Sequence, residues 1–119
     1  MDILVIVNES PWGSTLAGTA LRFTNAAIEG GCRVPAVFFQ NDGVYNALCG
    51  QASDDGLPSP FDGWRHLADE HGVQLLLCSA AVARRYEERI RNELSGDFQQ
   101  AGLARMWALT EDCDRVVTF

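Results

Sequence analysis

Cysteine is the residue type in this chain best suited to covalent chemistry, and Cys78 stands where such chemistry is expected. It ends the apolar run of residues 73–78 (VQLLLC) and precedes the small residues Ser79, Ala80 and Ala81. If a strand ends and a helix begins here, backbone N–H groups of the first helical turn point toward the thiol. That environment favours the thiolate, which is the nucleophilic form. Cysteine is also among the most buried residue types, so Cys78 is either a nucleophile or a small core residue.

The remaining cysteines and the histidines restrict the chemistry further. No two of the four cysteines lie within four residues of each other, which excludes a CxxC redox pair and zinc-knuckle spacing. Cys32 and Cys113 are expected to be inert, whereas Cys49 precedes a glycine in a loop. The two histidines, His66 and His71, form no ligand cluster, and neither is close enough in sequence to suggest a Cys-His catalytic pair. Thiol or persulfide exchange needs no such base, no metal and no cofactor.

Two other loops could contribute to a site. Pro11 and Gly13 lie in the segment NESPWGS, and the segment QNDGVYNA holds the candidate site-lining residues Asp42, Gly43, Tyr45 and Asn46. The stretch SPWGST could hold a phosphate through backbone N–H groups, which would make the chain a small flavin- or nucleotide-binding protein. The patterns GxxxxGK[ST] and GxGxxG are both absent, however. Turn formation and packing are the favoured interpretation of both loops.

The elements that would position these residues alternate along the chain. Strands are expected at residues 3–7, 36–39, 73–78 and 115–119, and helices between them, including one continuous helix over residues 79–94. A helical stripe is expected at Leu16, Ala20, Phe23 and Ala27, and Trp64 and Trp107 are expected in the core. The alternation predicts a three-layer α/β fold, a mostly parallel sheet with helices on both faces, as one domain over residues 1–119. The carboxyl ends of parallel strands share one edge, so the loops after the first three strands are expected to cluster there.

Composition excludes several classes of function. The 119 residues carry a net charge of −7, contain no lysine, and place their nine arginines mostly apart, which argues against nucleic-acid binding. No run of apolar residues reaches the length of a membrane span, and the N-terminus lacks the features of a signal peptide. The expected location is therefore the cytoplasm, with the cysteines as free thiols.

Four motifs together resemble the DsrE/TusD-like sulfurtransferases, small subunits of sulfur-relay complexes. They are SPWGS, VFFQNDGVYNA, W(x)₂LA(x)₂HGVQLLLC(x)AA(x)₂RR and GL…CDRVVTF, and they span nearly the whole chain in the family's order. The resemblance implies a DsrE/F-like, flavodoxin-like fold. It also implies a catalytic cysteine at Cys78, with Ala80, Ala81, Arg84 and Arg85 matching the residues that follow. On an ideal helix Arg84 and Arg85 lie about 100° apart, so at most one of them faces the site.

The resemblance further implies a sulfur-relay role. Cys78 would accept sulfane sulfur as a persulfide from a sulfur-donor protein and pass it to a cysteine of a sulfur-acceptor protein, in tRNA 2-thiouridine synthesis or in sulfur oxidation. Family members form homo- or hetero-oligomers, hexamers among them, in which subunits without the cysteine have supporting roles. A non-catalytic assembly subunit is therefore the alternative. Tyr86 departs from the family pattern, because it replaces a glycine ahead of a shortened segment.

Overall fold

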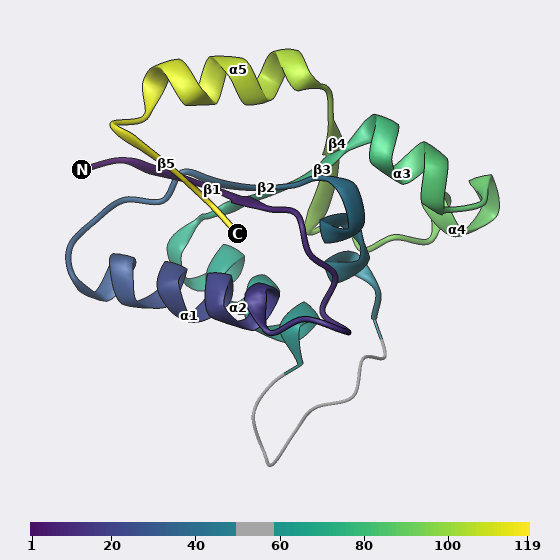
Figure 1. Cartoon of the computed structure of the whole chain (residues 1–119), viewed down its shortest axis with the longest axis horizontal. Helices are drawn as coiled ribbons and strands as arrows, with labels where there is room; N and C mark the ends of the chain where they lie inside the picture. The colour runs from purple at the N-terminus through teal and green to yellow at the C-terminus, as the bar shows by residue number, and fades with distance from the viewer. Residues whose placement is uncertain (50–58) are drawn as a thin grey trace.

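A parallel five-stranded sheet forms the centre of the molecule, in a computed structural model that describes residues 1–49 and 59–119 (Figure 1). The strand order is β4-β3-β2-β1-β5, and every neighbouring pair is parallel. The strands are β1 (Ile3–Val7), β2 (Ala36–Phe39), β3 (Gln74–Cys78), β4 (Phe98–Ala101) and β5 (Arg115–Thr118). The predicted α/β class is confirmed.

Helices cover both faces of this sheet. The helices α1 (Leu16–Glu29) and α2 (Pro60–His71) lie side by side on one face, and α5 (Leu103–Asp112) lies on the opposite face (Figure 1). The short helices α3 (Ser79–Arg85) and α4 (Glu88–Asn92) follow the carboxyl end of β3. The segment after β2, expected as a loop, is the 3₁₀ helix η1 (Asn41–Ala47). No helix in the described residues is long and apolar enough to span a membrane.

One strand was missing from the sequence-based prediction. β4 lies in a stretch where only a break between helices was expected, and its sequence, FQQA, alternates too briefly to indicate a strand. Phe98 anchors it, because its buried ring contacts Phe39 at 5.8 Å and stacks on Phe61 of α2 at 5.7 Å between ring centroids. The strand therefore forms through tertiary packing rather than through local preference.

Local signals explain α2 well and α1 only in part. The Ser59 side chain accepts a hydrogen bond from the backbone N–H of Asp62, Pro60 occupies the first turn, and Gly72 ends the helix in the left-handed conformation. The polar segment before Ser59 falls mostly outside the described residues. In α1 the buried positions are Ala17, Ala20 and Thr24. Of the predicted stripe, Ala20 is buried and Phe23 and Ala27 pack half-buried against the core, whereas Leu16 is exposed.

The single helix expected over residues 79–94 is interrupted. α3 ends at Arg85, and Tyr86 leaves the helical conformation with φ −114° and ψ 136°. Its buried hydroxyl donates a hydrogen bond to the Val44 carbonyl at 3.0 Å. This contact with η1 holds the chain out of the helix, and α4 begins two residues later.

The two tryptophans expected in the core have different environments. Trp64 is fully buried and meets Phe39 edge-on at 5.2 Å. Trp107, in contrast, is 62% exposed on α5, so that prediction was wrong. Trp64 lies on the apolar stripe that its helix predicts, whereas Trp107 was expected in the core from its residue type alone.

Candidate functional site

The segments after β1, β2 and β3 meet at the carboxyl edge of the sheet, as predicted. The Asn41 side-chain amide donates to Asn8 Oδ1 at 3.0 Å, and the Gln40 backbone N–H donates to the Val7 carbonyl at 3.0 Å. The buried Asn46 side chain donates to the carbonyls of Glu9 at 3.1 Å and Gly43 at 2.8 Å. These bonds fix η1 against the loop that follows β1.

Gly43 allows this close approach. A Cβ atom at this position would lie 2.0 Å from the Val7 carbonyl oxygen, at the end of β1. No side chain fits in that space unless the backbone moves. Gly43 and Asn46 were both expected to line the site. Both are buried, and they hold η1 against the end of β1 and the loop that follows it.

A second set of contacts joins η1 to α3. The Arg85 guanidinium donates from Nε to Asp42 Oδ1 at 2.9 Å, and Tyr45 lies 5.5 Å from Tyr86 between ring centroids. Burial, with a smaller contribution from Tyr45, raises the pKa of Tyr86 above its ordinary value. The hydroxyl therefore remains a donor to Val44 throughout the neutral range. Arg85 is the arginine that turns toward η1, whereas Arg84 is exposed and forms no ion pair in the described part of the chain.

Cys78 lies between the sheet and α3. It is the last residue of β3, its backbone occupies the N-cap position of α3, and its register partner is Ala101 of β4. The residue is only 8% exposed. Of the small residues that follow, Ala80 is exposed, Ser79 is half-buried and Ala81 is buried. The strand-to-helix position predicted for this thiol is correct, and its burial bears on the choice between a nucleophile and a small core residue.

No sequence pattern indicated that β4 would border the cysteine. Because Ala101 pairs with Cys78, the chain leaves β4 at the same edge and enters α5 through Gly102. Two helices therefore begin at this edge, α3 directly after Cys78 and α5 after its register partner (Figure 1). Helix N-termini carry partial positive charge, which suits an anionic sulfur.

The loop after β1 uses its polar groups on its own backbone. Ser10 Oγ donates to the Trp12 carbonyl at 2.6 Å, and Ser14 Oγ accepts from the Leu16 N–H at 3.1 Å. Gly13 supplies the left-handed turn at φ 70°, next to Pro11 and the half-exposed Trp12. The backbone N–H of Leu16, which a phosphate bound at the start of α1 would need, therefore already donates to Ser14. This arrangement favours the turn interpretation over a phosphate cradle.

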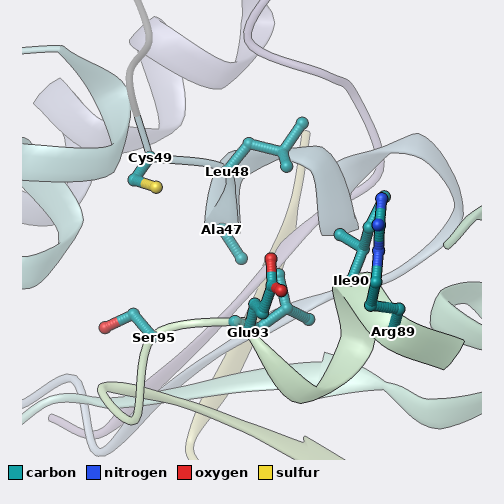
Figure 2. Close-up of a pocket in the computed structure, with 8 residues that line it drawn as sticks. Ala47, Leu48, Cys49, Arg89, Ile90, Glu93 and Ser95 are labelled. Carbon is teal, nitrogen blue, oxygen red and sulfur yellow. The ribbon is translucent and has the colours of Figure 1, made fainter. Parts of the chain in front are cut away.

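A pocket of about 340 Å³ lies between the end of η1 and α4 (Figure 2). Its lining residues include the exposed Cys49, but not Cys78; the full set is Ala47, Leu48, Cys49, Arg89, Ile90, Glu93, Leu94 and Ser95. No sequence pattern indicated it, because the break after α3 that creates it was not expected. The pocket is therefore separate from the environment predicted for the catalytic thiol.

The other cysteines differ from Cys78 in their surroundings. Cys32 and Cys113 are half-buried, and Cys49 is exposed. The pKa of the Cys113 thiol is raised, mainly by burial and then by the carboxylates of Asp2 and Asp112. The thiol therefore resists ionisation, which agrees with the expectation that Cys113 is inert. Within residues 1–49 and 59–119, no three His, Cys, Asp or Glu side chains gather into a metal site.

The fold and this edge define a parallel α/β protein with a cysteine at a strand-to-helix junction. The DsrE/DsrF-like family model matches residues 1–119, so the chain belongs to that family, whose members generally act in sulfur relay. Among solved structures, the chain is similar to the YchN protein from E. coli, with a TM-score of 0.82 and 22% sequence identity. The match covers 100% of this chain and 99% of that one, and it supports the fold.

Proposed function

We propose that this protein is a sulfur-relay sulfurtransferase that carries sulfane sulfur as a persulfide on Cys78. The observation that carries the proposal is the position of Cys78 at the carboxyl end of β3 and the N-cap of α3, in a chain whose family generally relays sulfur. The edge of a parallel sheet where strands end is the usual place for chemistry in such folds.

The reaction consists of two thiol exchanges. The Cys78 thiolate attacks the outer sulfur of a donor persulfide, R–S–S⁻; a new S–S bond forms as the old one breaks, and R–S⁻ leaves. The thiolate of an acceptor cysteine then attacks the outer sulfur of the Cys78 persulfide, and Cys78 departs as a thiolate. Sulfur oxidation states balance at each step, so no external oxidant, metal or cofactor is required.

The surroundings of Cys78 suit a carrier. Ala80 is small and exposed, which leaves room for an approaching cysteine, and Arg84 adds an exposed positive charge on α3. The limited exposure of Cys78 shields a bound persulfide from solvent and from side reactions. Tyr86 holds η1 against α3 through its hydrogen bond to Val44 and its contact with Tyr45, and the Asp42–Arg85 ion pair adds a weaker contact.

The partners follow from this chemistry. A sulfur-donor protein must present a persulfide, and a sulfur-acceptor protein must present a thiol on a segment narrow enough to reach the end of β3. The acceptor pathway is either tRNA 2-thiouridine synthesis or sulfur oxidation. Both deliver sulfur to the same kind of acceptor, a protein cysteine.

The burial of Cys78 favours one second candidate, a non-catalytic assembly subunit in which Cys78 only packs. The native thiol would then be unreactive. Iodoacetamide labelling under native conditions separates the two functions: a carrier becomes alkylated at Cys78, and a packing residue is alkylated only after denaturation.

A cyanolysis assay tests the proposal. The protein is incubated with a persulfide donor and desalted, and the sulfane sulfur is released with cyanide as thiocyanate. Wild-type protein and Cys49→Ser should each release sulfur, and Cys78→Ser should release only background. Cys49→Ser is the matched control, because it removes the exposed thiol of the pocket. Equal release from wild-type and Cys78→Ser would contradict the proposal.

A further inference from the structure

The pocket between η1 and α4 has aliphatic walls on both sides. Ala47 and Leu48 line it from the end of η1, and Ile90 and Leu94 line it from α4 and the residues just after that helix. Its volume of about 340 Å³ is at the lower end of the range of about 300–1,000 Å³ that is typical of small-molecule sites. The pocket therefore suits a ligand of the size of a single amino acid.

Two side chains of opposite charge share the α4 wall of this pocket. Arg89 and Glu93 are four residues apart, a spacing that on a helix brings Cβ atoms to about 5–6 Å from each other. Both residues are exposed, and neither forms an ion pair with another residue in the described part of the chain. Figure 2 shows the Glu93 carboxylate reaching from the α4 side toward Ala47. One ligand can therefore meet a guanidinium and a carboxylate together.

The hydroxyl group in the lining is already committed to other partners. Ser95 Oγ donates to Asp97 Oδ2 at 2.9 Å and accepts from the Asp97 backbone N–H at 3.3 Å. Recognition of charge therefore rests on Arg89 and Glu93. A ligand with only a negative charge would be repelled by Glu93, and one with only a positive charge would be repelled by Arg89.

We propose that this pocket binds a small zwitterion with an aliphatic stem, which is the chemistry of a free aliphatic α-amino acid. Arg89 donates to the ligand carboxylate, and Glu93 accepts from the ligand ammonium group. The two ligand charges are attached to one carbon atom, which matches the close spacing of the two side chains. The aliphatic stem lies between Leu48 and Ile90 and is removed from water. Cys78 does not line the pocket, so this proposal and sulfur relay can fail independently.

Alkylation of Cys49 reports whether the pocket is occupied, because this exposed thiol is part of its lining. Full-length protein is treated with iodoacetamide at increasing concentrations of L-leucine, and mass spectrometry gives the rate for each cysteine-containing peptide. L-Leucine should slow the alkylation of Cys49 to a saturating limit and leave that of Cys32 unchanged. Isopentylamine lacks the carboxylate and isocaproate lacks the ammonium group, so each should need at least about tenfold more for equal protection. Absence of protection by L-leucine, or equal protection by all three compounds, would overturn the proposal.

Charge-neutralising variants assign the two contacts. Arg89→Gln and Glu93→Gln should each weaken protection by L-leucine at least about tenfold, and neither should change the urea midpoint of unfolding appreciably, because both side chains are exposed. Glu88→Gln is the matched control, since Glu88 is exposed on the same helix but does not line the pocket. It should bind L-leucine like wild type. Undiminished protection in folded Arg89→Gln or Glu93→Gln would overturn the proposal, as would an equal loss in Glu88→Gln.

Discussion

At the residue scale, Gly43 and Tyr86 determine the shape of the site. Gly43 gives η1 its close approach to the end of β1, and Tyr86 ends α3 by bonding to Val44. Cys78 depends on both, because they position the segments on either side of it. The family resemblance implies a glycine where Tyr86 stands, and the shortened segment after it leads directly into α4.

Replacement of Gly43 by alanine should destabilise the protein by about 2 kcal/mol or more, because the added methyl group would overlap the Val7 carbonyl oxygen. Urea unfolding monitored by circular dichroism measures the change. Gly96→Ala is the control, since a Cβ at that position meets no atom within 4 Å. Equal midpoints for Gly43→Ala and wild type would show that η1 is not held as described.

Tyr86 should make stability depend on pH in the alkaline range. Its pKa in the folded state is raised above the usual value of 10.0, so its contribution is complete below that pH and is lost as the pH rises further. Tyr86→Phe keeps the ring and removes the hydroxyl, at a cost of about 1 kcal/mol near neutral pH. The difference in unfolding free energy between wild type and Tyr86→Phe should shrink from about pH 9 to about pH 11. A difference that stays constant over this range would contradict the burial of the Tyr86 hydroxyl.

At the element scale, the site is an assembly of η1, α3 and the loop after β1, held together by few contacts. Much of it could be predicted from the sequence. The apolar runs identified β1, β2 and β3, and the parallel topology then placed Cys78, Asp42 and Pro11 at one edge. The strand-to-helix position of Cys78 followed from the change of periodicity after it.

The missing elements were those that tertiary contacts create. β4 depends on the packing of Phe98 against Phe39 and Phe61. The end of α3 depends on the hydrogen bond from the Tyr86 hydroxyl to the carbonyl of Val44, which lies 42 residues earlier in the chain. Neither contact leaves a local pattern in the sequence. For the same reason the sequence left open whether Cys78 is a nucleophile or a small core residue, because β4 was not expected beside it.

The Asp42–Arg85 pair should couple η1 to α3 only weakly. The Asp42 side chain is largely exposed, and exposed ion pairs contribute at most about 1 kcal/mol. A double-mutant cycle with Asp42→Asn and Arg85→Gln, measured by urea unfolding, should give a coupling energy below that value. Arg84→Gln should show no coupling to Asp42→Asn. A larger coupling between Asp42 and Arg84 would mean that Arg84 faces η1.

At the scale of the whole molecule, the sheet is covered unevenly. α1 and α2 pack together on one face, and α5 lies on the other (Figure 1). Trp107 of α5 is exposed.

The central claim is that Cys78 carries the sulfur, and peptide mapping by mass spectrometry tests it most directly. Native wild-type protein is loaded with a persulfide donor, alkylated to trap the product, and digested. The account predicts that the peptide containing Cys78 gains the mass of one sulfur atom, whereas the peptides containing Cys32 and Cys113 do not. A loaded protein in which the added sulfur lies only on Cys49, or in which Cys78 remains an unmodified thiol, would contradict it.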